Sequence, residues 1–109
     1  MAIGIQRGDV LLVELDLTRG SEMRKTRPCV VVSPDELNDH LSTYIVTPLT
    51  TGGYVYPFRL SCRFGGKHGY VVADQLRTID HDRVVRRLGK LPGPIVRRIL
   101  LVLQEMFSP

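Results

Sequence analysis

The chain has 109 residues, of which 43% are hydrophobic and 24% charged, and it carries a formal net charge of +4 at pH 7. This composition is typical of a single globular domain over residues 1–109 and argues against a disordered chain, while a membrane span would need about 20 consecutive apolar residues, which are absent. The basic balance permits binding to a polyanion or to an acidic protein, and the N-terminus does not resemble a signal peptide.

The two cysteines, Cys29 and Cys62, lie far apart beside strand-like sequence and form no partner motif. This favours buried, reduced thiols over a disulfide or a zinc site, and we expect a cytoplasmic protein. The three histidines are scattered without the spacing of metal ligands, so we expect no metal.

The first half of the chain predicts three strands and one brief helix. Alternating apolar residues over 11–17 predict a half-buried strand, and the polar stretch 18–27 predicts a long exposed loop. The β-branched run 28–32 predicts a central strand, and 43–49 a further strand. Between them, Ser33-Pro34-Asp35-Glu36 predicts a helix start with the Ser33 hydroxyl as its N-cap.

The second half predicts an edge strand over residues 54–60, because Pro57 cannot donate to a ladder. On this strand Tyr54, Tyr56 and Phe58 would share one face, where aromatic side chains either stack on the bases of a nucleic acid, one of the polyanions that the basic balance permits, or, as we favour, form core or dimer contacts. A loop over 65–69 and a strand over 70–73 follow. The segment 84–91 is either another strand or a helical turn.

The last element is the clearest. Apolar residues recur at three- and four-residue spacing from Ile95 to Phe107, and Pro92-Gly93-Pro94 precedes them. The whole pattern predicts a mainly β fold with some α structure, namely a small barrel-like antiparallel sheet against which one C-terminal helix packs.

Several short motifs occur in a fixed order along nearly the whole chain. They are Arg7-Gly8-Asp9-Val10, Gly20-Ser21-Glu22, Lys25-Thr26-Arg27-Pro28, Ser33-Pro34, Thr47-Pro48-Leu49-Thr50, Tyr56-Pro57-Phe58 and Asp74-Gln75-Leu76-Arg77-Thr78-Ile79. In order and spacing the chain resembles the MazF/PemK toxin family. The resemblance implies an SH3-like barrel of the CcdB/MazF type, a homodimer, and an acidic antitoxin that masks an RNA groove. It also implies metal-independent cleavage of single-stranded RNA through the 2′-hydroxyl.

Cleavage by the neighbouring 2′-hydroxyl needs a base, an acid and a cation that stabilises the crowded phosphate. Arg27 is the strongest candidate for the cation, because it lies where the polar loop meets a rigid strand and its guanidinium can bind two phosphate oxygens. The alternative is that Arg27 pairs with a structural carboxylate such as Asp9 or Asp74.

Two further residues are candidates for catalysis. Glu22 is the only acid between Asp16 and Asp35, and its basic neighbours should lower its pKa, which favours the role of base. A loop ion pair is the alternative for Glu22. For Thr50, the resemblance implies a hydroxyl donated to the phosphate, although threonine is also an ordinary strand residue.

The resemblance makes Asp74 a fourth catalytic candidate. Some relatives have an arginine two residues before this aspartate, whereas this chain has Val72, which moves catalytic weight to Arg27 and Glu22. Asp74 is then left to order the site or to read a base; the alternatives are that it ties down a turn or pairs with Arg77. The candidates for RNA contact are Arg24, Lys25, Thr47, Gln75 and Arg77.

Two rival functions are consistent with this architecture. The first is a CcdB-like gyrase poison, which acts by protein binding through a C-terminal tryptophan; this chain has no tryptophan. The second is a catalytically inactive relative that only binds RNA or an antitoxin, which would need Arg27, Glu22 or Thr50 to be missing.

Overall fold

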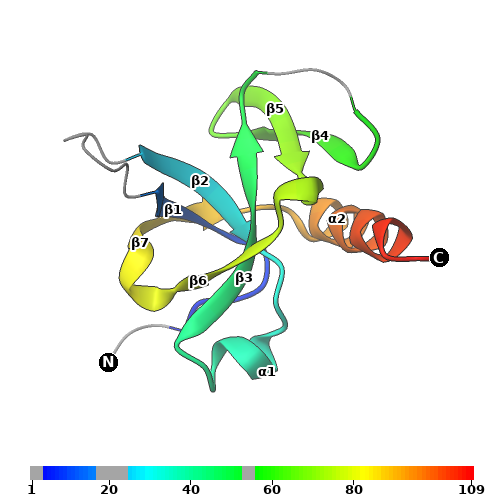
Figure 1. Cartoon of the computed structure of the whole chain (residues 1–109). Coiled ribbons are helices and arrows are strands. Elements are labelled where there is room, and N and C mark those ends of the chain that lie inside the picture. The colour runs from blue at the N-terminus through cyan, green and yellow to red at the C-terminus, as the bar shows by residue number, and fades with distance from the viewer. Residues whose placement is uncertain (1–3, 17–24, 53–55) are drawn as a thin grey trace.

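The computed structural model describes residues 4–16, 25–52 and 56–109 (Figure 1). Seven strands form one sheet: β1 (Asp9–Asp16), β2 (Lys25–Val31), β3 (Thr43–Thr50), β4 (Arg59–Phe64), β5 (Lys67–Val72), β6 (Arg77–Asp80) and β7 (Val84–Lys90). The α-helices are α1 (Asp35–Asn38) and α2 (Gly93–Met106), and short 3-10 turns cover Ala73–Gln75 and His81–Arg83. The predicted mainly β fold with a C-terminal helix is confirmed.

Strand β3 is the centre of the sheet. The strand order is β4-β5-β3-β2-β1-β7, and β6 pairs with the first half of β3, while β5 pairs with its last two residues. All of these pairs are antiparallel. The two ends of the strand order approach each other, since a Cβ atom added at Gly89 of β7 would lie 3.2 Å from the ring of Phe64 on β4. The sheet therefore curls into a barrel-like form (Figure 1).

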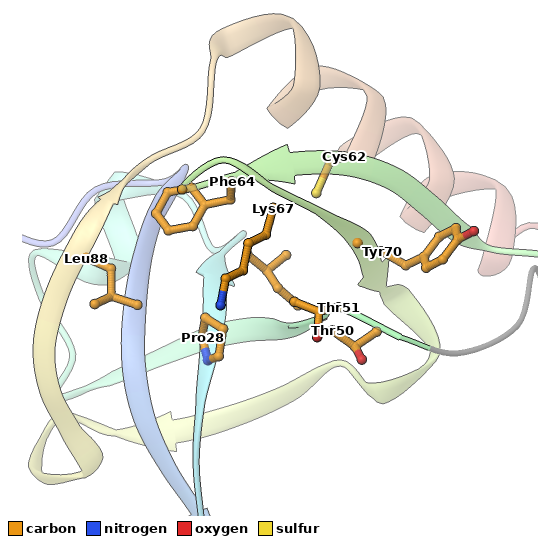
Figure 2. A pocket seen from close by; sticks show the side chains of 11 residues that line it. Pro28, Thr50, Thr51, Cys62, Phe64, Lys67, Tyr70 and Leu88 are labelled. Atoms are coloured by element: carbon orange, nitrogen blue, oxygen red, sulfur yellow. The ribbon is translucent and has the colours of Figure 1, made fainter.

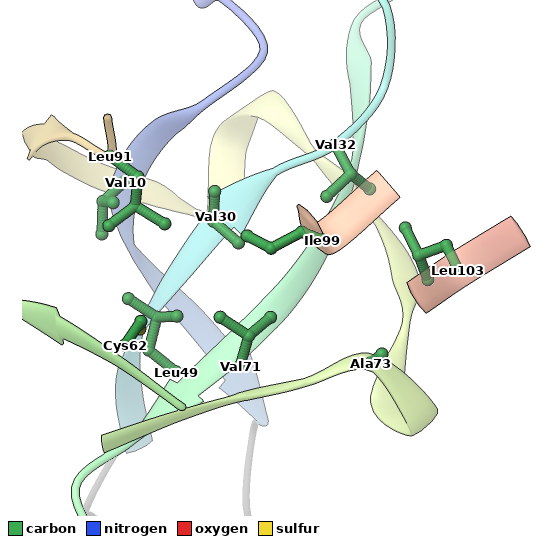
Figure 3. Packing of buried hydrophobic residues seen from close by; sticks show 10 residues of the cluster. All are labelled: Val10, Val30, Val32, Leu49, Cys62, Val71, Ala73, Leu91, Ile99 and Leu103. Atoms are coloured by element: carbon green, nitrogen blue, oxygen red, sulfur yellow. The ribbon is translucent and has the colours of Figure 1, made fainter. Parts of the chain in front are cut away.

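The central strands have a hydrophobic core on each face, because successive side chains point to opposite sides of a strand. One core lies beneath α2, whose Ile99 and Leu103 pack against Val30, Leu49 and Val71 (Figure 3). The other core contains Leu11, Val13, Cys29, Val31, Tyr44, Val46 and Ile79. The strand predicted over 11–17 is thus more buried than expected: Val10 enters the first core and Leu11 the second, and both are fully buried.

Three predicted boundaries are wrong. Residues 25–27 belong to β2 rather than to a loop, and β4 begins only at Arg59. Phe58 has φ 65°, a left-handed conformation that cannot continue a strand, so Tyr56 and Phe58 precede β4 instead of lining it; Tyr54 is outside the described residues. The loop predicted over 65–69 is only the turn Gly65-Gly66, because both glycines take positive φ and β5 starts at Lys67.

Two further elements are settled by contacts. Residues 84–90 form strand β7, paired with β1, rather than a helical turn. The predicted Ser33 N-cap is wrong, since the N-cap of α1 is Pro34. The Ser33 hydroxyl instead donates to Oδ1 of Asn38 at 2.5 Å and accepts from the backbone N–H of Ile45 at 3.1 Å, which ties α1 to β3.

Candidate functional site

Arg27 lies near the start of β2, opposite Val13 of β1, and its side chain is exposed. Alternation along β2 places it on the same face as Cys29 and Val31, the face turned away from α2. The two carboxylates considered above as structural partners of Arg27 each pair with another arginine. Asp9 is paired with Arg87 at 3.2 Å, and Asp74 with Arg59 at 3.2 Å.

Arg77 adds a second cation to this face. It is exposed at the start of β6, opposite Val46 of β3, and Val46 belongs to the same core as Cys29. The positive charges of Arg27 and Arg77 both act on the Cys29 thiol and favour its thiolate, but burial outweighs them and raises the pKa of Cys29 to about 12. Both guanidinium groups are therefore near enough to act on one buried thiol, while their side chains are exposed to solvent.

The cysteines are both free and buried, as the sequence predicts. Burial also raises the pKa of Cys62, so both thiols stay protonated at pH 8, well below the pKa of Cys29. Because the thiolate is the reactive form, we expect iodoacetamide at pH 8 to leave the folded protein unmodified and to label both cysteines in urea. Mass spectrometry gives the count; rapid labelling of folded protein at Cys29 would contradict this burial.

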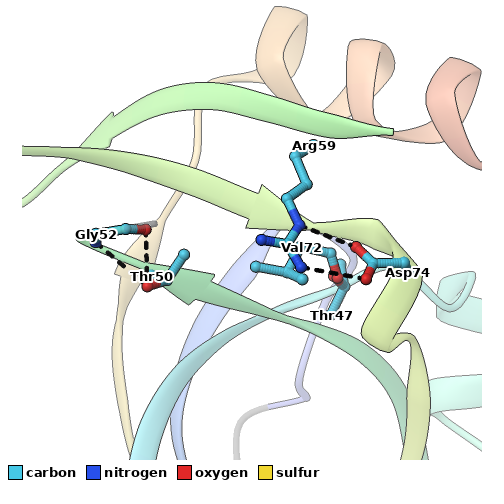
Figure 4. Close-up of polar contacts among 6 residues, drawn as sticks. All are labelled: Thr47, Thr50, Gly52, Arg59, Val72 and Asp74. Carbon is cyan, nitrogen blue, oxygen red and sulfur yellow. Dashed lines mark hydrogen bonds and ion pairs between the residues drawn. The ribbon is translucent and has the colours of Figure 1, made fainter. Parts of the chain in front are cut away.

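Thr50 ends β3 on the same face as Pro48 and Val46. Pro48 is paired with Cys29, so Arg27 and Thr50 each lie two residues beyond this pair and on one face. The Thr50 hydroxyl donates to the carbonyl of Gly52 at 3.2 Å and accepts from its N–H at 3.3 Å (Figure 4). Both hydrogen bonds are long, so a phosphate oxygen could replace the Gly52 carbonyl as acceptor at low cost.

Asp74 lies in the 3-10 turn after β5 and is held by Arg59 through two contacts, of 3.2 and 3.3 Å (Figure 4). The hydrogen bonds from Arg59 are the main reason why the pKa of Asp74 lies below its usual value. Of the alternatives for Asp74, the pairing with Arg77 is wrong, since its partner is Arg59. Asp74 is a carboxylate at neutral pH and can accept a proton or order the turn, but it cannot donate one.

Thr47, predicted to contact RNA, is fully buried, and its hydroxyl donates to the carbonyl of Val72 at 2.6 Å. It cannot reach a polynucleotide, so this prediction is wrong. The reason is that residue 47 alternates with Val46 and Pro48 and points beneath the sheet toward β5. By contrast, Lys25 and Gln75 are both exposed. Glu22 and Arg24 lie outside the described residues.

A cavity of about 360 Å³ adjoins this site (Figure 2). Pro28, Thr50 and Thr51 lie on one side of it, and Phe64 and Lys67 of the β4–β5 hairpin on another. Its size falls in the range of small-molecule sites, roughly 300–1,000 Å³. Sequence reasoning named no catalytic or RNA-contacting residue in this hairpin, although the alternation of apolar and polar residues over 59–64 is a signal for a two-faced strand.

Within residues 4–16, 25–52 and 56–109, no group of three or more His, Cys, Asp or Glu side chains could hold a metal ion. In the same part of the chain, no helix is both long enough and apolar enough to cross a membrane.

Residues 6–107 match the family model described as the PemK-like, MazF-like toxin of type II toxin–antitoxin systems. The chain is also 35% identical over 108 residues to the endoribonuclease toxin ChpB of Escherichia coli K12, an alignment that covers 93% of this chain and 92% of ChpB. The chain belongs to the PemK-like, MazF-like toxin family.

A second relative and two solved structures are also similar to the chain. Endoribonuclease PemK of Escherichia coli is 36% identical over 102 residues, covering 88% of this chain and 77% of PemK. Among solved structures, MazE–MazF from Deinococcus radiodurans (form II) shares the fold, with a TM-score of 0.83, 23% identity and coverage of 98% and 100% of the two chains. A mycobacterial endoribonuclease in complex with its cognate antitoxin has a TM-score of 0.78, 25% identity and coverage of 96% and 97%.

Proposed function

We propose that this toxin is an endoribonuclease that cuts single-stranded RNA, chiefly mRNA, at short sequence motifs and so blocks translation. Cleavage proceeds without a metal by attack of the ribose 2′-hydroxyl, and yields a 2′,3′-cyclic phosphate or 3′-phosphate and a 5′-hydroxyl. Relatives named endoribonucleases, 35% and 36% identical to the chain, support this proposal. Cytoplasmic location follows from the substrate.

One observation carries the proposal: Arg27 is exposed on the same face as Thr50 and Arg77, and is engaged by neither Asp9 nor Asp74. A guanidinium in this position can bind two oxygens of the phosphate as negative charge builds up on it. Arg77 increases the positive potential on the face, and the Thr50 hydroxyl supplies a hydrogen-bond donor. RNA provides the nucleophile itself, so proton transfer remains the protein's second task.

Two residues are candidates for proton transfer, Glu22 and Asp74. Glu22, the proposed base, lies outside the described residues, and its role stays a prediction. Asp74 is ionised and paired with Arg59, so we assign it to ordering the turn and, with Gln75, to contacting a base. Arg24 and Lys25 are proposed to contact the RNA backbone.

The direct test incubates purified protein with a long RNA in the presence of EDTA and sequences the new 5′ ends. Cuts at one short motif, which vanish when the nucleotide before the cut carries a 2′-deoxyribose, are the expected result. A parallel DNA gyrase supercoiling assay addresses the CcdB-like alternative. Inhibition of gyrase without RNA cleavage would reject the proposal.

We further propose a homodimer and an acidic antitoxin as partners. Two structural neighbours are a MazE–MazF structure and an endoribonuclease in complex with its cognate antitoxin, which supports an antitoxin as partner. The net charge of +4 favours an acidic partner.

The buried position of Thr47 leads to a prediction. Thr47→Val keeps the side-chain shape but leaves the Val72 carbonyl without its hydrogen bond, so we expect the free energy of unfolding to fall by about 1–3 kcal/mol. Cleavage per folded molecule should not change, because Thr47 is not accessible to RNA. Urea denaturation and cleavage assays measure the two effects; a tenfold loss of cleavage by folded protein would show that Thr47 acts on the substrate.

A further inference from the structure

The outward face of the β4–β5 hairpin carries polar and aromatic side chains that the core does not use. In the antiparallel pairing, Ser61 lies opposite Tyr70 and Arg63 opposite His68. Directly opposite residues point to the same side of the sheet, whereas the intervening Cys62 enters the core beneath α2. Ser61, Arg63 and His68 are exposed, and Tyr70 is half-buried.

Contacts within the hairpin hold its rings in place. The Ser61 hydroxyl and Nε2 of His68 are 2.6 Å apart. The His68 ring meets the Tyr70 ring edge-to-face, with centroids 5.5 Å apart and an interplanar angle of 78°. Figure 2 shows Tyr70 at the opposite side of the view from Phe64, and Tyr70 also lines the cavity described above. An imidazole and a phenol are thus held in a fixed arrangement before any ligand binds.

At the base of the hairpin, a further aromatic ring lies beside a cation. The guanidinium of Arg59 lies 4.6 Å above the Tyr56 ring and also binds Asp74. Residues 56–73 contain three cations, Arg59, Arg63 and Lys67, and no acidic residue. Because Asp74 compensates the charge of Arg59, the net positive charge of the hairpin comes from Arg63 and Lys67, near its turn.

This face is continuous with the candidate cleavage site. Thr50 of β3 is paired with Tyr70 of β5, and Tyr70 is paired with Ser61 of β4. A row of same-side residues therefore runs from Thr50 across Tyr70 to Ser61. A polynucleotide whose scissile phosphate lies at Thr50 can continue along this row.

We propose that Arg59, Ser61, Arg63, His68 and Tyr70, here named the hairpin platform, bind the part of a single RNA strand that flanks the cleaved bond. The proposal rests on the proposed endoribonuclease function. Proteins bind single strands by stacking bases on aromatic rings and placing cations along the phosphates. Both groups are present in the hairpin platform, and its oriented rings favour RNA over an acidic peptide, which needs cations alone.

The test compares the binding of three RNAs that carry 2′-deoxyribose at the cleaved position. One covers only the cleavage motif, the second has four nucleotides added on the 5′ side, and the third has four nucleotides added on the 3′ side. For the wild-type protein, one extension should tighten binding about fivefold or more, since each stacked base contributes roughly 1–3 kcal/mol.

The variant carrying Arg63→Gln and His68→Ala should bind the extended RNA no more tightly than the short one. Its affinity for the short RNA should match that of the wild-type protein. For the extended RNA, the slope of log affinity against log salt concentration should fall by the equivalent of about one phosphate contact. Arg86→Gln is the matched control: it removes an exposed arginine of β7 and should keep the full gain from length. Circular dichroism verifies that both variants are folded.

Cleavage of the all-ribose short RNA separates the two proposals. If the wild-type protein cuts it but no extension improves binding, or if the double variant retains the gain, the hairpin platform is refuted while the endoribonuclease function stands. If the wild-type protein cuts no RNA at all, the proposed function fails and the hairpin platform with it.

Discussion

Arg27→Ala is expected to lower the rate of RNA cleavage by about 10²–10³-fold while the protein stays folded. Arg27 is the exposed guanidinium that we propose neutralises the phosphate, and removing one donor to a transition-state oxyanion typically costs this factor. Arg27→Lys keeps the charge but loses the planar fork, so it should recover only part of the rate. Single-turnover cleavage of an RNA that contains the mapped motif gives both values.

The control for Arg27→Ala is Arg98→Ala, which removes an equal charge from an exposed position on α2. This variant should cut at nearly the wild-type rate, because α2 covers the opposite face of the sheet. Gel filtration and circular dichroism should be unchanged for both variants. A folded Arg27→Ala protein that cuts within threefold of the wild-type rate would show that Arg27 does not bind the reacting phosphate.

Gly69→Ala is expected to destabilise the protein and to disrupt the position of Thr50. A Cβ atom at residue 69 would lie 2.0 Å from the Thr50 carbonyl oxygen, 2.9 Å from its carbonyl carbon and 3.2 Å from Cα of Thr51. These atoms are backbone and cannot move aside without separating β5 from β3. We expect a loss of about 1–3 kcal/mol in the free energy of unfolding, and thus a drop in Tm of roughly 5–20 °C.

Gly93→Ala is the matched control, because a Cβ atom there meets nothing within 4 Å at the start of α2. Its Tm should equal or slightly exceed that of the wild-type protein. Cleavage by Gly69→Ala, measured well below its Tm, should also be weaker, since the displaced strand carries Thr50. An unchanged Tm for Gly69→Ala would show that β3 and β5 are less closely packed than the structure indicates.

The regular elements could largely be predicted from local patterns. Helix α2 has an apolar stripe at helical spacing, and β2 is a β-branched run between two neighbours, so burial alone selects the conformation of each. Around β4 the prediction fails, because the positive φ of Phe58 interrupts a stretch whose alternation looks continuous. Backbone conformation at one residue is set by its surroundings, which a local pattern does not contain.

The candidate site shows the same division. Arg27 was placed on the surface by its position where a polar stretch meets an apolar strand, and it is exposed. Thr47 and Thr50 belong to one short motif, yet the first is buried and bonded to Val72 while the second ends the strand at the surface. Residues 47 and 50 are three apart on one strand, so their side chains lie on opposite faces, and the packing of the sheet decides which of them is buried.

Composition, alternation and motif order are properties of the chain alone, and they were enough to indicate a basic, mainly β toxin of this family; the role of Arg27 stays a prediction. The pairing of charges could not be predicted from these properties. Asp74 binds Arg59, fifteen residues away, instead of the nearby Arg77. Asp9 of β1 binds Arg87 of the neighbouring strand β7. Such contacts form only when strand register brings distant residues within a few ångströms. An ion pair depends on distance in space, which sequence separation does not measure.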